Sequence, residues 1–396
     1  MHIALCTPIS LDMFDKHVEH TEPLPHGCTY PFAFFLAMKL LDAGHHVTVV
    51  TSGFDVPCRI AWTGQEGRLK VIAVHRRRTY YYCCDVYRRE VMAMRAELKQ
   101  AAPDIIHAQW TYEYADAALS TRLPCLVTAR DAPWLIAWHF RKFYRLYRAV
   151  YSSLWIVPRI QYFTCVSPHI KSKYEKEPFF KTTRLSVIPN GLERGLFASG
   201  HKEGIRDLKA PCFVSVSGWG RLKNVPCLLR AFAGVRSLYP RATLILVGSE
   251  LGKDQKAETW AQERQLSDGV VFRGALPYGT MLNVLENEAD LFVHTTKEES
   301  FSMTTLEAMA KGVPVIGGRD SGGVPWLLDN GSAGVVVDIN SPEAVAAGMM
   351  RLVANPEEYK AIAQCAYQRA KDCFTLDAVA QQYQKEYENV LQSAKR

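Results

Sequence analysis

Short apolar runs recur along the whole chain, and segments with helical spacing separate several of them. Apolar runs of this length are typical of buried strands. Strands are predicted at His2–Pro8, Val47–Ser52, Leu69–Val74, Pro103–Ala108, Cys125–Thr128, Phe163–Ser167, Leu185–Gly191, Phe213–Ser217, Thr243–Gly248, Val270–Arg273, Leu291–His294 and Val313–Ile316. Helices are predicted at Phe32–Asp42, Pro226–Leu238, Thr304–Lys311 and Ala361–Leu391. Strands that alternate with helices imply α/β domains with parallel sheets, because parallel neighbours need a crossover connection.

The length of the chain suits more than one such domain. Its 396 residues are enough for two or three domains that each bury a core. Asn190–Gly191 is a turn pair, and Ala198 to Ala210 is polar and basic with little periodicity. We therefore expect an interdomain linker at Ala198 to Ala210.

A single loop in the second half of the chain carries the strongest candidate chemistry. The backbone N–H groups of Phe301, Ser302 and Met303 lie before or within the first turn of a predicted helix, where they suit a phosphate. Glu299 and Glu307 stand eight residues apart around this turn. A carboxylate accepts the two hydroxyls of a sugar diol. The alternative is that Glu299 caps the helix and Glu307 makes a surface salt bridge.

The sequence ESFSMTTLE from Glu299 to Glu307, followed by AMAKGVPVIG, resembles the E-x7-E donor-site motif of retaining glycosyltransferases of family four. This family has the GT-B fold, in which two Rossmann-like α/β domains face each other across a cleft. The resemblance implies that Glu299 contacts the donor sugar and that Glu307 holds the ribose hydroxyls. It also implies that the amides of Phe301–Met303 contact the diphosphate and the sugar.

The resemblance spans nearly the whole chain and implies three parts. Residues 1–195 would be a Rossmann-like domain that binds the acceptor. Residues 196–374 would be a Rossmann-like domain that binds the nucleotide sugar. Residues 375–396 would form a C-terminal helix that packs back on the first domain. After Gly323 the family usually has Pro-Glu, whereas this chain has Pro325–Trp326.

A basic glycine loop opens the second predicted domain. In GWGRLKN, Gly218 permits a close backbone approach, and Arg221 and Lys223 supply the cations that a buried diphosphate needs. The resemblance implies the same role for both cations, although this loop is shorter than the family pattern. The run VVFRGALP matches the strand beside the nucleobase in the family, so the backbone around Arg273 would contact the base.

The first predicted domain offers four further candidates. Gly27, in a loop after the first strand, stands where the family has a phosphate-side glycine, or it is only a turn glycine. His107 and the pair Arg130–Asp131 follow predicted strands, and ligands of such sheets bind beyond the carboxyl ends of strands. His107 is a candidate base or a structural histidine. Arg130, where the family often has histidine, suits a carboxylate on the sugar or acceptor. Alternatively, it pairs with Asp131 or braces the diphosphate.

A basic aromatic segment follows these candidates. From Trp134 to Lys173 the chain has seven Lys or Arg residues and no Asp or Glu, and aromatic residues are interleaved at roughly helical spacing as far as Trp155. One interpretation is an interfacial helix, Trp134–Trp155, that touches an anionic membrane surface. The other is a helix that packs its aromatics on the core and exposes its arginines. No nucleic-acid-binding motif is present, so we expect no nucleic acid partner.

Composition and charge indicate which partners and which cellular location suit the protein. The net charge of +7 suits a phosphate-bearing substrate or an anionic surface. The 11 cysteines lack a C-x-x-C motif, and neither a signal peptide nor a membrane-spanning run is evident. These features predict a cytoplasmic protein, and the membrane interpretation of Trp134–Trp155 would place it at the inner face of the membrane. No D-x-D motif or His/Cys cluster predicts a metal site.

Taken together, the residues and the resemblance predict a metal-independent, retaining glycosyltransferase without a cofactor. It would move a sugar from a nucleotide-sugar donor to a lipid-linked sugar or glycan acceptor, as in polysaccharide biosynthesis. Helix amides, Arg221 and Lys223 would stabilise the leaving diphosphate. Two alternatives remain: another GT-B enzyme such as a nucleotide-sugar epimerase, and a non-catalytic nucleotide-sugar binding protein.

Overall fold

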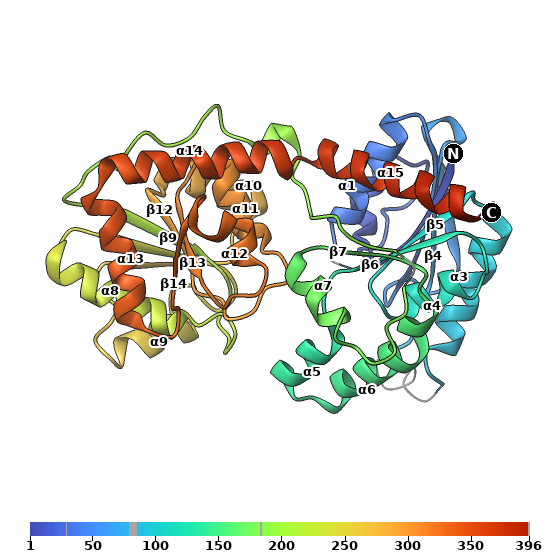
Figure 1. Ribbon diagram of the computed structural model, residues 1–396, viewed down its shortest axis with the longest axis horizontal. Coiled ribbons are helices and arrows are strands. Elements are labelled where there is room, and N and C mark those ends of the chain that lie inside the picture. The colour runs from blue at the N-terminus through green and yellow to red at the C-terminus, as the bar shows by residue number, and fades with distance from the viewer. Residues whose placement is uncertain (29, 79–84, 183, 395–396) are drawn as a thin grey trace. The chain divides into compact units, whose positions relative to one another are not determined.

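The computed structural model describes residues 1–28, 30–78, 85–182 and 184–394. The chain folds into two compact units, which are considered one at a time (Figure 1). The first contains Met1–Gly191 and Leu376–Arg396, and the second contains Leu192–Thr375. The chain therefore leaves the first unit after Gly191 and returns to it at Leu376.

The first unit is built on one eight-stranded sheet with the order β3-β4-β2-β1-β5-β6-β7-β8. All neighbours are parallel except β3, which runs antiparallel to β4 at the edge. The strands are β1 His2–Cys6, β2 His46–Gly53, β3 Ile60–Gly64, β4 Leu69–His75, β5 Ile105–Gln109, β6 Cys125–Ala129, β7 Tyr162–Cys165 and β8 Arg184–Val187. The central strands are buried on both faces, which is why they read as continuous apolar runs.

Helices cover this sheet, and the last helix of the chain is one of them. They are α1 Phe32–Asp42, α3 Arg88–Ala101, α4 Glu113–Leu119, α5 Pro133–Phe140, α6 Phe143–Tyr151, α7 Pro168–Tyr174 and α15 Leu376–Ala394. Along α15, Val379, Tyr383, Tyr387 and Val390 are buried in the same core cluster as residues of β1 and α1. This apolar stripe at helical spacing joins α15 to the first unit.

The second unit has a six-stranded parallel sheet with the order β11-β10-β9-β12-β13-β14. Its strands are β9 Cys212–Val216, β10 Thr243–Val247, β11 Val270–Gly274, β12 Leu291–His294, β13 Val315–Gly318 and β14 Val335–Val337. Its helices are α8 Val225–Leu238, α9 Lys256–Gln262, α10 Tyr278–Asn283, α11 Met303–Ala310, α12 Val324–Leu327, α13 Pro342–Ala354 and α14 Pro356–Cys373. Both units are thus Rossmann-like, which confirms the predicted fold class.

Every predicted strand overlaps a strand of the structure, but three helical and linker predictions need correction. The segment Ala198 to Ala210 is no free linker, because the N–H groups of Ala198 and Lys202 donate to carbonyls of α11 and its end, at 3.0 and 2.9 Å. The predicted helix Trp134–Trp155 breaks at Arg141, whose φ of 46° is left-handed. The predicted helix Ala361–Leu391 is interrupted between α14 and α15.

In the first unit, the elements β3, α3, α4 and α7 are not predicted by the apolar pattern. The edge strand β3 is half exposed, and α3 carries charges on most of its surface. None of the helices in the described residues is both long enough and apolar enough to cross a bilayer.

Candidate functional site

The residues around Glu299 and Glu307 gather at the carboxyl ends of β9, β12 and β13. In a parallel sheet these ends meet at one edge, where ligands bind. Two backbone hydrogen bonds hold the loops together: Lys297 N donates to Leu222 O, and Gly323 N donates to Glu299 O, both at 2.7 Å. Segments that are far apart in sequence therefore form one surface, called here the Glu299–Glu307 site.

Two consecutive glycines make room for this arrangement. Gly322 has a φ of +62°, and a Cβ there would lie 2.2 Å from the carbonyl oxygen of Glu299. A Cβ on Gly323 would lie 2.6 Å from the carbonyl oxygen of Ser300. Any other residue would push the Glu299 loop away. The pair was not singled out from the sequence, although the run SGG shortly after β13 is a signal for it.

Glu299 and Lys223 form an ion pair in the site. Lys223 Nζ lies 2.7 Å from Glu299 Oε1, and both side chains are partly exposed. The two residues come from the loops after β12 and β9, so the fold brings together two residues that the sequence analysis proposes separately. Because an ammonium group has three donors, Lys223 can hold Glu299 and still donate to an anionic ligand.

His294, at the end of β12, lies beneath this pair and was missed by the sequence analysis. Its side chain is 2% exposed, and its Nε2 lies 3.7 Å from Glu299 Oε1 and 3.4 Å from Ser302 Oγ. Burial lowers the pKa of His294 to about 4, so the ring is neutral at pH 7. The only signal for it in the sequence is a polar residue at the carboxyl end of an apolar strand.

The start of α11 is held by one polar and one apolar contact. Ser302 is the N-cap, and its Oγ accepts from the N–H of Thr305 at 3.4 Å. The ring of Phe301 is buried edge-on against Trp326 and Phe374, with centroids 6.1 and 5.7 Å away. Trp326, which stands where the family usually has Glu, therefore anchors this turn by packing.

This anchoring leaves the predicted amides free to bind a ligand. Within the described part of the chain, the backbone N–H groups of Phe301, Ser302 and Met303 donate no hydrogen bond. They lie at the positive end of α11. They are therefore suited to donate hydrogen bonds to an anion, as predicted from the sequence.

Glu307 is a buried carboxyl group with an unused acceptor. It lies on α11 and is 5% exposed. Its Oε1 accepts from the hydroxyl of Tyr278 at 3.0 Å, and its Oε2 has no hydrogen-bond partner among the residues described. Burial raises the pKa of Glu307 to about 7. The alternative of a surface salt bridge is therefore wrong. Tyr278, on α10, is a further residue that the sequence analysis missed.

Three further predicted residues of the second unit, Arg221, Gly218 and Arg273, differ from one another in their contacts. Arg221 is exposed and makes no hydrogen bond or ion pair with any described residue. A Cβ on Gly218 would make only ordinary contact within the protein, 3.6 Å from Ser249 O, so a close approach of a ligand to this backbone stays a prediction. The guanidinium of Arg273 binds both carboxylate oxygens of Glu288, at 2.5 and 2.6 Å. Its side chain is therefore engaged in a structural ion pair.

In the first unit, Gly27 is required by the backbone. Its φ is +76°, and a Cβ there would lie 2.9 Å from the carbonyl oxygen of Ile9. Its N–H donates to Asp55 Oδ2 at 2.9 Å. Gly27 therefore has a backbone role in its loop, where it forms an isolated bridge with Ser10, and its N–H is already used.

His107 has the arrangement of a structural histidine. It is fully buried on β5, with Nδ1 2.7 Å from the hydroxyl of Tyr387 and Nε2 2.7 Å from Thr128 Oγ1. Burial lowers the pKa of His107. Since both nitrogens are engaged, neither is free to act as a base here.

Arg130 is a buried cation whose partners are all neutral. Its guanidinium donates to Gln109 Oε1 at 2.7 Å, to Asn190 Oδ1 and to the hydroxyl of Tyr383 at 3.3 Å. It also lies 4.2 Å from the ring centroid of Phe32. It makes no ion pair with any residue in the described ranges.

The neighbouring Asp131 is turned to a different partner. It accepts from the hydroxyl of Tyr112 at 3.2 Å, and burial raises its pKa. The alternative that Arg130 pairs with Asp131 is therefore wrong. The positive charge of Arg130 has no carboxylate beside it.

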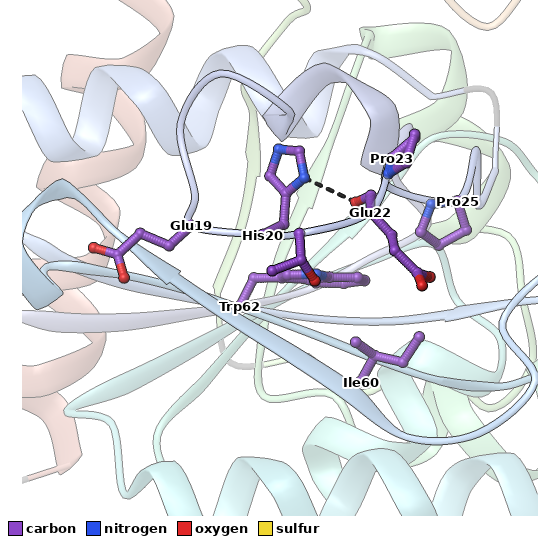
Figure 2. A pocket seen from close by; sticks show the side chains of 8 residues that line it. Glu19, His20, Glu22, Pro23, Pro25, Ile60 and Trp62 are labelled. Atoms are coloured by element: carbon purple, nitrogen blue, oxygen red, sulfur yellow. Dashed lines mark hydrogen bonds between the residues drawn. The ribbon is translucent and has the colours of Figure 1, made fainter.

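A separate hollow in the first unit contains none of the predicted residues (Figure 2). It lies between the loop at residues 19–25 and β3, and its volume is about 550 Å³. Trp62 lies below His20, which is hydrogen-bonded to the carbonyl oxygen of Glu22 at 2.8 Å. Glu19 and Glu22 line it, and no Lys or Arg is among its lining residues. This charge opposes a diphosphate, so the hollow is no alternative to the Glu299–Glu307 site.

Family models match both units of the chain. Residues 32–194 match the model described as Glycosyltransferase Family 4, and residues 200–369 match the model described as Glycosyl transferases group 1. The D-inositol 3-phosphate glycosyltransferase of Segniliparus rotundus is 29% identical over 210 residues, which is 51% of this chain and 45% of that protein. The chain spans about half the length of the curated relatives it matches.

Solved structures resemble the whole fold. Sucrose-phosphate synthase from Thermosynechococcus elongatus superposes with a TM-score of 0.75 at 20% identity, covering 99% of this chain and 100% of that chain. Anabaena HepE, solved in complex with UDP and glucose, gives a TM-score of 0.69 at 17% identity, covering 98% and 100%. At these identities the likeness concerns the fold.

The fold is therefore of the GT-B class, with two Rossmann-like domains that each have a parallel sheet. Within this class, the first unit is similar to the Glycosyltransferase Family 4 model. The second is similar to the Glycosyl transferases group 1 model, and the Glu299–Glu307 site lies inside that matched region.

Proposed function

We propose that this protein is a retaining glycosyltransferase that takes its sugar from a nucleotide-sugar donor. The observation that supports this most is the state of Glu307, a buried carboxyl group with one oxygen unpaired. Leaving a buried carboxylate oxygen without a partner costs free energy. A ribose diol would supply the missing donors and would favour the ionised form of the carboxyl.

The diphosphate of such a donor would lie beside Glu307 at the start of α11. The free amides of Phe301–Met303 and the exposed Arg221 would neutralise its charge. Lys223 would donate to the diphosphate while it still holds Glu299. These groups are fixed before the leaving group departs, so they would stabilise the charge that develops on it. With these cations in place, we propose that turnover needs no metal ion and no cofactor.

Glu299 would act on the transferred sugar. Its carboxylate is held between Lys223 and His294, and these contacts orient it. A carboxylate in this position would stabilise an oxocarbenium-like sugar as the bond to the diphosphate breaks. Retention of configuration comes to this proposal from the family resemblance.

We assign the acceptor to the first unit and expect a lipid-linked sugar or a glycan. The Segniliparus relative is a glycosyltransferase with a phosphorylated acceptor in its name. Arg130 is the feature of this unit that favours an acidic group, because its buried charge has only neutral partners.

A cytoplasmic location agrees with the free thiols of the nine cysteines that the structure describes.

A donor-hydrolysis screen tests the proposal. The protein is incubated with UDP-, GDP-, ADP- and dTDP-sugars, and release of the nucleoside diphosphate is followed. We expect release from one class of donor, an α-configured product from an α-configured donor, and loss of release in Glu299→Gln. Glu357→Gln, an exposed glutamate on α14, is the matched control and should behave as wild type. Binding of a nucleotide sugar without release from any donor would indicate a binding protein instead.

A further inference from the structure

The two helices α5 and α6, together with Leu154 and Trp155 after them, form a surface element that the proposed chemistry does not use (Figure 1). We call it the aromatic hairpin. The helices contact each other, and the chain reverses between them at Arg141. No Asp or Glu occurs between residues 132 and 174.

The inner face of the aromatic hairpin is fixed by polar contacts. Arg148 is buried, lies 3.5 Å from the ring centroid of Tyr112 and lies 3.4 Å from Glu113 Oε2. Tyr151 stacks on Tyr87 at 5.3 Å and donates to Asp116. The hairpin is therefore anchored to the first unit by these contacts.

The outer face is largely apolar, so the packing interpretation of this segment holds only in part. Aromatics on the core and arginines in water are found for Tyr151 and Arg141. By contrast, the structure exposes Phe143 by 84%, Trp138 by 67% and Trp155 by 59%. Further exposed apolar side chains are Trp134, Phe140, Leu146, Val150 and Leu154. So large a set on two adjacent helices is unusual for a surface that meets only water.

Cations accompany these apolar side chains. Arg141 lies 5.5 Å from the ring centroid of Trp138, and Arg145 lies 5.5 Å from that of Phe140. A groove of about 540 Å³ is lined by Arg141 and Lys142 together with Trp134, Ala137, Trp138, Phe143 and Leu146. Trp and Arg at the border of an apolar face are typical of segments that lie at the lipid headgroups, where long basic side chains reach the phosphates.

We propose that the aromatic hairpin docks the protein on an anionic lipid bilayer. Phe143, Trp138 and Trp155 enter the boundary between headgroups and acyl chains, and Arg141 and Lys142 contact lipid phosphates. The absence of carboxylates from residues 132–174 favours this partner, because basic residues beside an apolar face gain attraction from an anionic surface. A second copy of the chain would bring like charges together at the same face.

Vesicle flotation tests this proposal without reference to catalysis. The full chain is mixed with vesicles of phosphatidylcholine alone or with added phosphatidylglycerol. We expect flotation with the anionic vesicles at about 0.1 M salt and release at about 1 M, because the screening length falls from about 10 Å to about 3 Å. We expect flotation to be lost in two double variants, Phe143→Ser/Trp138→Ser and Arg141→Glu/Lys142→Glu. In the second variant, the affinity for the anionic vesicles should fall by about fivefold or more per charge.

Matched controls separate the hairpin from general surface effects. Met92→Ser and Lys99→Glu change an exposed apolar and an exposed basic residue on α3 of the same unit, and should float as wild type. Circular dichroism and melting curves check that every variant folds. Equal flotation with neutral and anionic vesicles, flotation retained in both hairpin variants, or no flotation would overturn the proposal. So would concentration-dependent self-association without lipid that Phe143→Ser/Trp138→Ser abolishes.

Discussion

Lys223 Nζ lies 2.7 Å from Glu299 Oε1, which joins the loop after β9 to the loop after β12 by a charged hydrogen bond. The two residues are 76 positions apart in the sequence. In the proposed reaction they serve different parts of the donor, Lys223 the diphosphate and Glu299 the sugar. This division gives each residue its own expected kinetic effect.

Replacing the members of this pair should separate binding from turnover. Lys223→Ala should weaken binding of the nucleoside diphosphate by roughly 10- to 150-fold, the worth of one charge-assisted hydrogen bond of about 1.5–3 kcal/mol. Glu299→Gln should keep that affinity within a few-fold and lower kcat by about a hundredfold or more. Calorimetric titration and steady-state kinetics measure the two effects. The surface pair Arg351–Glu358 provides the control, because Glu358→Gln should change neither quantity. Equal loss of affinity in both site variants would contradict these roles.

The raised pKa of Glu307 makes a prediction about stability. The pKa is about 7 in the folded chain against an ordinary 4.5, so the folded state favours the protonated acid. The resulting contribution to the free energy of unfolding is complete below pH 4.5 and is lost as the pH rises through 7. Glu307→Gln is always neutral and should therefore be more stable than wild type at pH 8, by about 3 kcal/mol at most, and similar at pH 4. Urea unfolding at both pH values measures this, and lower stability of the variant at pH 8 would contradict it.

Metal dependence is a third test. Arg221, Lys223 and the amides at the start of α11 are proposed to stabilise the diphosphate, which is the role that Mg²⁺ or Mn²⁺ has in other phosphate chemistry. We therefore expect full turnover in excess chelator. Turnover that is lost on chelation and restored by Mg²⁺ or Mn²⁺ would contradict this part of the proposal.

Arg130 predicts a preference for an acidic substrate. If its charge binds a carboxylate on the sugar or acceptor, Arg130→His should impair an acidic substrate more than its neutral analogue, by about 1.5–3 kcal/mol in kcat/KM. Arg145→His changes an arginine of the aromatic hairpin and should not discriminate between the two substrates. Equal losses on both substrates in Arg130→His would show that the arginine only braces its neutral neighbours.

Much of the fold could be predicted from the sequence, because buried parallel strands read as continuous apolar runs. The edge strand β3 was missed because half of its side chains face solvent. The break at Arg141 could not be predicted, since a left-handed residue other than glycine leaves no local pattern. It changes which side chains the segment exposes: Arg148 and Tyr151 are buried, whereas Trp138, Phe143 and Trp155 are exposed.

Only those parts of the candidate site that local spacing or the family motif indicates could be predicted from the sequence. Glu299, Glu307 and the amides between them lie in one short segment, so their proximity follows from the sequence. Tyr278 and His294 join them through the packing of α10 and β12 against α11, which no motif records. The burial that raises the pKa of Glu307 is likewise a tertiary property.

The central claim is that Glu307 receives the ribose of a nucleotide, and a paired titration tests it most directly. The affinity for the preferred nucleoside diphosphate is measured for wild type and for Glu307→Gln at pH 6 and pH 8. At each pH the affinity of wild type is divided by that of the variant, which cancels the titration of the nucleotide itself. Because the diol needs the ionised carboxylate, whose pKa is about 7, wild type should be tighter by roughly 10- to 150-fold at pH 8 and should lose about tenfold of that advantage at pH 6. Equal affinities of the two proteins at both pH values would contradict the account.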